Sequence, residues 1–213
     1  MNRYDKRVRA LAVGLSALAG FVDAIGFIKL GGYFVSFMSG NSTRLAVGLA
    51  QGTSQAAIAA SLIATFVLGV VLGSLAGTRA KGRRRPTVLV LVGVLLAAAA
   101  CLDMFGLERG AIAAMALAMG AENTIFEENG ETRIGLTYMT GTLVKVGQRL
   151  AGMLSGGDKT AWIPYLALWL GLVTGAVVGA ALYAHLGLNA LWLAGIVSVA
   201  FALIAARLER TQY

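Results

Sequence analysis

The chain has 213 residues, of which 58% are apolar and only 13% are charged, and its mean hydropathy is +0.76. Soluble domains carry roughly 25% charged residues, so the composition excludes a soluble enzyme and predicts an integral membrane protein in contact with the lipid bilayer. The net charge of +8 does not indicate nucleic acid as a partner, because the basic residues lie at the ends of apolar segments, where they meet anionic lipid headgroups.

Eight apolar segments are candidates for helices that cross or enter the bilayer, whose core takes about 20 helical residues to span. In chain order they cover residues 8–28, 33–51, 55–77, 86–104, 111–126, 134–154, 162–185 and 188–206. The second and sixth segments differ from the others, because each contains small polar residues around a glycine where a spanning helix is usually most apolar. No small-residue cleavage site follows the first segment, so we expect no cleavable signal peptide.

The two polar clusters align as an internal repeat. With Ser39-Gly40 placed on Thr140-Gly141, the flanking residues also match, an acidic residue precedes each cluster, and a G-x-x-x-G pair follows it. Three features that recur in the same order predict a duplication, with repeat one at about residues 8–104 and repeat two at about 110–206. The chain then forms a single membrane domain over residues 1–213.

The distribution of Lys and Arg predicts the topology, since these residues are retained on the cytoplasmic side. If all eight segments cross, 11 basic residues lie inside and 7 outside, but if segments two and six return to the side they entered from, the count is 15 to 3. We therefore predict an all-α fold of six transmembrane helices plus two re-entrant broken elements. Both termini and the basic connector at residues 79–85 are then cytoplasmic. Each half has three crossings, which predicts two inverted-topology repeats, the plan of many secondary transporters.

The polar clusters are candidate substrate-binding residues, because they would begin the two short helices near the midplane. A helix start exposes unpaired N–H groups and a partial positive charge, which attract an anion or a polar oxygen. The alternative is that Ser39 and Thr140 only cap their helices. The candidate residues are Ser39, Gly40, Asn41, Ser42, Thr140, Gly141 and Thr142, with Asn123 as a further polar residue at this depth.

Two acidic residues, Asp23 and Glu122, lie inside apolar segments, where a carboxylate is costly and usually faces a partner, a cavity or a proton path. Their expected partners are Arg44 and Lys145, one in each repeat. This arrangement predicts either proton or ion coupling, or structural ion pairs that hold the broken elements.

The remaining motifs argue against catalysis and cofactor binding. One cysteine and one histidine cannot form a metal cluster, and no Walker loop, dinucleotide fingerprint or G-x-S-x-G elbow is present. We expect no enzymatic activity, no metal and no cofactor. The glycine pairs of residues 69 and 73 and of residues 175 and 179 predict close helix packing, within the monomer or across a homodimer.

The pattern of residues 20–24 and 34–41, with residues 120–123 and 137–143 in the second half, resembles the YoaK-like family of bacterial inner-membrane proteins. The resemblance covers nearly the whole chain and implies a six-span, multi-pass inner-membrane protein. The family was named as one of unknown function, so the resemblance implies no substrate.

Together these observations favour a secondary transporter or facilitator for a small polar or anionic solute, coupled to protons if the acidic residues take part. A passive channel lined by the same polar loops is the second hypothesis, and a non-transporting membrane scaffold is the third. The sequence leaves the substrate, the coupling ion and the oligomeric state open.

Overall fold

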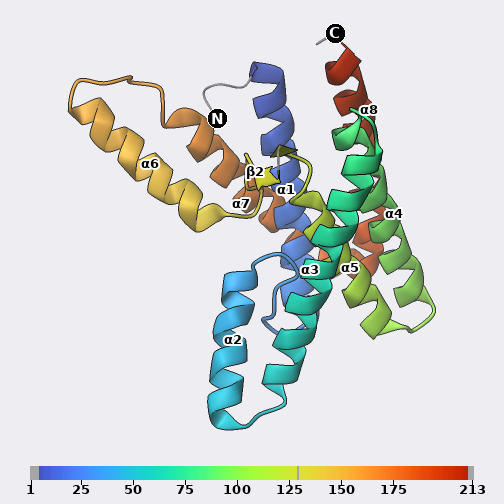
Figure 1. Cartoon of the computed structure of the whole chain (residues 1–213). Coiled ribbons are helices and arrows are strands. Elements are labelled where there is room, and N and C mark those ends of the chain that lie inside the picture. Colours follow the sequence, from blue (N-terminus) through green and yellow to red (C-terminus); the bar gives the residue numbers. More distant parts are fainter. Residues whose placement is uncertain (1–4, 129, 211–213) are drawn as a thin grey trace.

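The structure is a computed structural model that describes residues 5–128 and 130–210. The described residues form eight α-helices, a short 3-10 helix and a small β-hairpin (Figure 1). The elements are α1 (Lys6–Lys29), α2 (Met38–Gln51), α3 (Gln55–Arg79), α4 (Arg84–Met104), α5 (Glu108–Glu122), β1 (Glu127–Glu128), β2 (Glu131–Thr132), α6 (Met139–Leu154), α7 (Ile163–Leu186), η1 (Gly187–Asn189) and α8 (Ala190–Arg210). Each apolar segment overlaps one of these helices, so the prediction of a predominantly helical chain is confirmed.

Four stretches of the described chain are long and apolar enough to cross a membrane. Three of them are α1, α3 and α4, and the fourth covers 47 residues from α7 into α8, two helices that meet at η1 and point away from each other (Figure 1). Helices α2, α5 and α6 have only 14, 15 and 16 residues, fewer than the roughly 20 that a simple span requires. Helix α5 ends at Glu122, four residues earlier than the apolar segment suggested, because a polar turn follows it.

The main helix contacts come in matching pairs between the first four helices and the last four. Helices α1, α2, α3 and α4 correspond in order to α5, α6, α7 and α8. The contact of α1 with α7 therefore matches that of α5 with α3, and the contact of α2 with α3 matches that of α6 with α7. The contact of α1 with α8 matches that of α5 with α4. Helices α4 and α8 pack on each other. The core therefore lies between α1, α5 and the helices around them, while α2 and α6 each lie against the third helix of their own half.

The glycine pairs pack helices within the monomer. A Cβ atom on Gly69 or Gly73 would overlap the backbone of α5, and one on Gly175 or Gly179 would overlap the backbone of α1. Because only a residue without a side chain lets the backbones approach this closely, these glycines set both helix crossings. Of the two alternatives that the sequence left open, the intramolecular one is observed.

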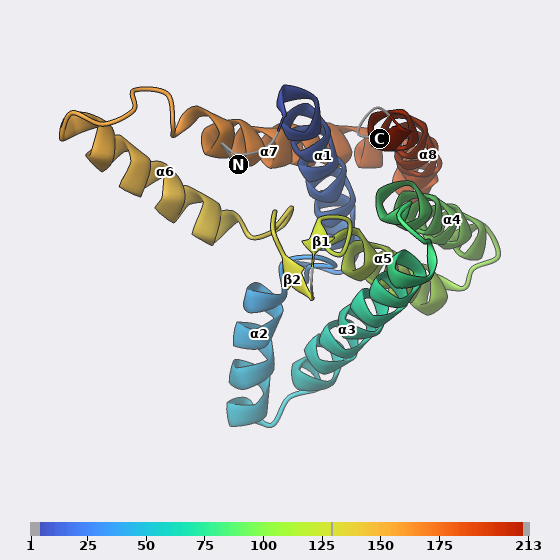
Figure 2. The ribbon, with the colours of Figure 1, turned by 45° about the horizontal axis from the view of Figure 1, so that its top comes forward.

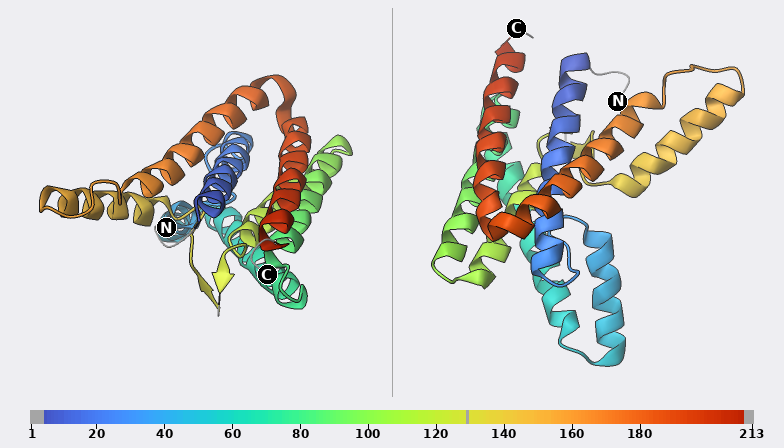
Figure 3. Two further views of the ribbon diagram at one scale, coloured as in Figure 1. Left: turned by 90° about the horizontal axis from the view of Figure 1, so that it is seen from above. Right: turned by 180° about the vertical axis from the view of Figure 1, so that it is seen from behind.

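The pairs α2–α3 and α6–α7 project from the centre as two arms (Figures 2 and 3). The chain leaves α1 at one end of the molecule, turns back toward the centre over residues 30–37, and α2 then runs toward the end that α1 had reached (Figure 1). In the second half, residues 133–138 lead to the start of α6 near the centre, from which α6 runs toward the opposite end. The start of α1 and the end of α8 lie at the same end of the molecule (Figures 1 and 3).

Candidate functional site

The first turns of α2 and α6 converge near the centre of the molecule in every view (Figures 1, 2 and 3). The structure therefore brings together the two polar clusters that the sequence singled out, although they are about 100 residues apart in the chain. We define the convergent site as residues 37–41 and 138–142.

Neither helix start in the convergent site is capped by a side chain. The N-cap residues are Phe37 and Tyr138, and neither side chain accepts a hydrogen bond from its helix. Ser39 and Thr140 are each the second residue of their helix, so the alternative prediction that they act as N-caps is wrong. Both are exposed, and their hydroxyl groups form no hydrogen bond within the described parts of the chain.

Three backbone N–H groups at these helix starts have no acceptor among residues 5–128 and 130–210. They belong to Ser39, Thr140 and Gly141, whereas the N–H groups of Gly40 and Thr142 bond back to the N-cap carbonyls of Phe37 and Tyr138. The space beside Gly141 is open, since a Cβ placed there would have no other atom within 4 Å. The convergent site therefore presents donors from two helix starts, with open space beside Gly141.

The first loop is held by two polar side chains. One carboxylate oxygen of Asp23 accepts the N–H groups of Val35 at 2.9 Å and Ser36 at 2.8 Å. The amide of Asn41 accepts the N–H of Phe34 at 3.1 Å and donates to the same residue's carbonyl oxygen at 2.6 Å. Asn41, which the sequence assigned to substrate binding, is fully buried and uses its side chain to fix this loop.

The second loop is held by a different set of groups. The Thr137 hydroxyl donates to the side-chain oxygen of Asn123 at 3.1 Å, and the Asn123 amide donates to the Met119 carbonyl at 3.0 Å. The Ser16 hydroxyl lies 3.0 Å from the carbonyl oxygen of Leu136, so it attaches α1 to this loop. Asn123 therefore positions the second loop. Sequence reasoning missed Ser16, because a lone hydroxyl in an apolar segment gives no specific signal. Thr137 belongs to the second polar cluster, but sequence reasoning assigned it no separate role.

The glycine contacts indicate a different correspondence between residues of the two halves from the one that the sequence suggested. Gly20 packs on the backbone of α7 at Leu172 as Gly120 packs on the backbone of α3 at Phe66. Three residues after these glycines come Asp23 and Asn123, the two side chains that hold the loops. In this register Asn123, and not Glu122, takes the place of Asp23, and the residue that corresponds to Glu122 is Val22.

The predicted ion pairs of Asp23 with Arg44 and of Glu122 with Lys145 are not formed. The Arg44 guanidinium lies over the ring of Tyr33, 4.8 Å from its centroid, and the Lys145 ammonium lies 5.6 Å from the centroid of Tyr165. Both cations belong to α2 and α6 but sit one turn or more beyond the helix starts. The ion pairs of the described residues lie instead at the helix ends and on the β-hairpin, among them Lys29 with Glu108 and Arg84 with Glu127.

Glu122 is completely buried at the end of α5, and neither of its carboxylate oxygens has a hydrogen-bond partner in the described part of the chain. A carboxyl group in this situation is costly in a membrane protein and usually has a functional reason.

The other candidate hydroxyls are committed to their own helices. Ser42 donates to the Met38 carbonyl at 2.8 Å, and Thr142 donates to the Tyr138 carbonyl at 3.1 Å. The groups available to a solute are therefore the two hydroxyls of Ser39 and Thr140 and the free N–H groups beside them.

Comparison with known proteins places the chain among membrane proteins. Residues 11–204 match the family described as Protein of unknown function (DUF1275). The chain is 41% identical to the UPF0700 transmembrane protein RA0705 of Rhizobium meliloti (strain 1021) over 202 residues, which are 94% of this chain and 87% of that protein. No solved structure is a significant match. Together with its apolar helices, this similarity identifies the chain as a membrane protein.

Proposed function

The chain belongs to the DUF1275 family, whose function is unknown, and we propose that it is a secondary transporter or facilitator for a small polar or anionic solute in the bacterial inner membrane. One observation carries the proposal: two uncapped helix starts from different halves of the chain lie near each other at the centre of the molecule, each with an N–H group that has no acceptor in the described residues, and the space beside Gly141 is open.

The chemistry of the convergent site suits an oxygen-rich or anionic group. Each helix start contributes a partial positive charge in addition to its N–H donors, and the two contributions add where the helices converge. The hydroxyls of Ser39 and Thr140 supply donors that rotate to fit the ligand. No carboxylate oxygen of the described residues points at these N–H groups, because Asp23 accepts from the preceding loop.

The proposal includes the six-span topology, with α2 and α6 as re-entrant elements and the two halves inverted. It is supported by the matching helix contacts and by the direction of α2, which runs back toward the end that α1 reached. Irregular backbone at membrane depth is tolerated only where it is buried in protein or lines a wet cavity, which agrees with the bonding of both loops to buried side chains. Under this topology both termini and the basic connector face the cytoplasm.

Glu122 is the residue that we assign to proton coupling. It is buried without a partner in the described residues, and it stands in the half whose loop is held by the neutral Asn123. A carboxyl group that releases and takes up a proton as the two halves rock against each other would link solute movement to a proton gradient.

The test is uptake by the purified protein in liposomes, with radiolabelled phosphate, sulfate, formate and glycerol as separate probes and with or without a pH gradient. Saturable uptake of at least one probe that responds to the gradient is the expected result. Current that rises in proportion to the driving force would favour the channel hypothesis. Absence of flux for every probe would favour the scaffold hypothesis and contradict the proposal.

The convergent site is tested by one substitution and a matched control on the same helix. Gly141→Leu places a side chain in the open space beside the free N–H groups, whereas Gly147→Leu places the same side chain in open space two turns further along α6. We expect Gly141→Leu to abolish uptake and Gly147→Leu to retain it. Equal uptake by both variants would exclude this site.

The topology is tested by accessibility labelling in a Cys101→Ser background, with a single cysteine introduced at Lys29 or at Gln51. These residues end α1 and α2, and the re-entrant arrangement requires both to react with an impermeant reagent from the same side. Labelling from opposite sides would show that α2 crosses the bilayer.

A further inference from the structure

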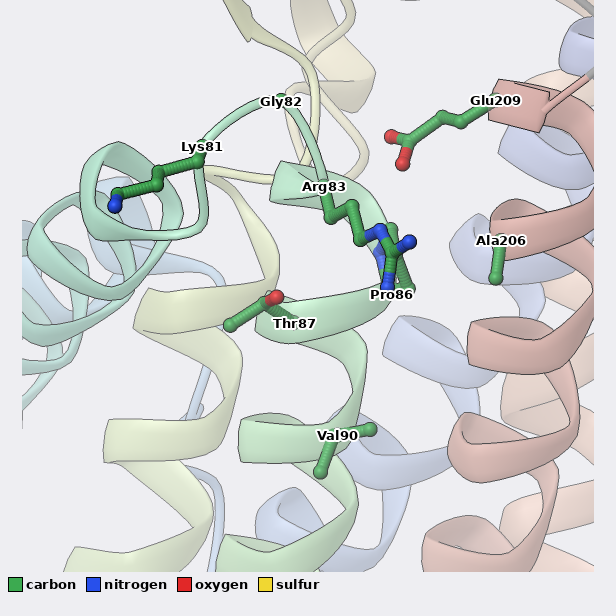
Figure 4. A pocket seen from close by; sticks show the side chains of 8 residues that line it. All are labelled: Lys81, Gly82, Arg83, Pro86, Thr87, Val90, Ala206 and Glu209. Atoms are coloured by element: carbon green, nitrogen blue, oxygen red, sulfur yellow. The ribbon is translucent and has the colours of Figure 1, made fainter.

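A groove with a volume of about 680 Å³ opens between the start of α4 and the end of α8, beside the connector that follows α3 (Figure 4). Its size lies within the range of small-molecule sites. Eight residues line the groove: Lys81, Gly82, Arg83, Pro86, Thr87, Val90, Ala206 and Glu209. None of these residues belongs to the convergent site.

The groove has a polar mouth and an apolar wall. Lys81, Arg83 and Glu209 lie at the helix ends, whereas Val90 and Ala206 lie further along α4 and α8 (Figure 4). A groove that is charged at the helix ends and apolar along the helices matches a phospholipid. The headgroup would lie at the membrane surface and one acyl chain against the helices.

The two cations at the mouth form no hydrogen bond or ion pair within the described residues, although the charge of Arg83 acts on the Glu209 carboxylate across the groove. Arg84 is bonded to Glu127 and the Arg85 guanidinium lies over the ring of Phe126, whereas Lys81 and Arg83 form no hydrogen bond or ion pair within residues 5–128 and 130–210. Lys81 also adopts a positive φ of 47°, a conformation that is uncommon outside glycine and is frequent at ligand sites. These two side chains are available to a phosphate group.

Glu209 adds a requirement that a simple anion does not meet. In Figure 4 its carboxylate extends from α8 into the space that Arg83 enters from the opposite wall. The carboxylate interacts with the backbone N–H of Arg85 and with the charges of Arg85 and Arg83, but its Oε2 atom is buried and has no hydrogen-bond partner in the described part of the chain. An acceptor of this kind calls for a hydrogen-bond donor, and a primary ammonium supplies both the donor and the positive charge.

We infer that the groove binds a phospholipid whose headgroup carries a phosphate and a primary ammonium, as phosphatidylethanolamine does. The phosphate contacts Arg83 and also Lys81, once the flexible side chain of Lys81 turns toward the mouth. The ammonium donates to Glu209, and one acyl chain follows Val90 and Ala206. A quaternary ammonium cannot donate a hydrogen bond, and a glycerol headgroup carries no positive charge, so the site distinguishes this lipid from phosphatidylcholine and phosphatidylglycerol. The inference requires only a membrane protein and is independent of the proposed transport.

The experiment is native mass spectrometry of the delipidated protein in mild detergent, titrated with dioctanoyl phosphatidylethanolamine, phosphatidylglycerol or phosphatidylcholine. We expect the ethanolamine lipid to bind about fivefold or more tightly than either of the others. Glu209→Gln should remove this preference without weakening phosphatidylglycerol, and the double variant Lys81→Ala with Arg83→Ala should weaken all three lipids. Thermal unfolding of each variant verifies that it is folded.

Matched controls are Glu128→Gln, an exposed glutamate on the β-hairpin, and Arg79→Ala, an exposed cation at the end of α3, neither of which lines the groove. Both should bind the three lipids as the unmodified protein does. Equal binding of the three lipids by the unmodified protein, or a preference that survives Glu209→Gln, would overturn the inference. Binding of soluble glycerophosphoethanolamine as tightly as the lipid would also overturn it, because the acyl chain would then contribute nothing.

Discussion

Replacing Glu122 by valine should make the protein more stable. The corresponding residue of the first half is Val22, which is as completely buried as Glu122, so the fold accommodates valine at this place in the repeat. Glu122 itself has no hydrogen-bond partner within the described residues. The carboxyl group is therefore not required by the packing that the two halves share.

The magnitude follows from two opposing contributions. Insertion of an acidic side chain at the centre of a membrane helix costs about 2.5–3.5 kcal/mol, and valine is favourable by about 0.5 kcal/mol. The smaller volume of valine leaves part of the space unfilled, which costs about 0.5–1.5 kcal/mol if it resembles the loss of one buried methylene. The net gain is then about 1.5–3.5 kcal/mol, equivalent to an increase in Tm of roughly 3–14 °C for a chain of this size.

The assay is thermal unfolding in detergent, followed by intrinsic fluorescence, of the unmodified protein, Glu122→Val and Glu122→Gln. The glutamine variant removes the charge but keeps an unpaired polar group, so its Tm should lie between the other two. A Tm of Glu122→Val below that of the unmodified protein would refute the reasoning, since it would mean that the carboxyl group has a stabilising partner. If the coupling role is also right, the stabilised valine variant loses the response of uptake to a pH gradient.

Three further outcomes are expected. Asp23→Leu leaves two loop N–H groups without an acceptor and should lower the free energy of unfolding by about 2–4 kcal/mol. Asp23→Asn keeps an acceptor and should lower the free energy of unfolding by less. Thermal unfolding measures both variants. Glu127→Gln weakens the half-buried 3.0 Å pair with Arg84 and should cost about 1 kcal/mol in the same assay. The N–H and hydroxyl of Thr160 lower the pKa of Asp158 below its ordinary value. The contribution of these two hydrogen bonds to the order of the loop between α6 and α7 is therefore present at neutral pH and is lost only as the pH falls through that lowered pKa. Amide hydrogen exchange of this loop, measured against pH, should show faster exchange once the pH falls below the lowered pKa.

The helices of this chain could be predicted from the sequence because their signals are local. Apolar runs of 16 to 24 residues separated by basic or glycine-containing turns define the segments, and each overlaps a helix in the structure. The starts of α2 and α6 were also predictable, since a polar cluster around a glycine is unusual in the middle of an apolar run. The glycine pairs indicated close packing, and the structure assigns it to α3 with α5 and to α7 with α1.

The partners of the polar side chains could not be predicted, because they depend on contacts between distant segments. Sequence spacing suggested that Arg44 would neutralise Asp23, but the loop N–H groups are closer to that carboxylate and satisfy it directly. The predicted correspondence of Glu122 with Asp23 rested on their charge and on their nearly equal distances from the two polar clusters. The register set by Gly20 and Gly120 shows that the loop-holding residue of the second half is Asn123, because an amide and a threonine hydroxyl perform the task there without a charge.

This difference between the halves bears on how a solute would lie in the convergent site. The Asp23 carboxylate accepts from the loop that leads into α2, so it reduces the positive potential near that helix start, whereas the loop before α6 is held by neutral groups. The two free N–H groups of Thr140 and Gly141 and the open space beside Gly141 are also on α6. On the proposed function, the anionic group of the solute should therefore lie against α6 and its remaining atoms toward Ser39. Thr140→Val should then weaken uptake of an anionic probe more than Ser39→Ala does, and the opposite order would place the anion at α2.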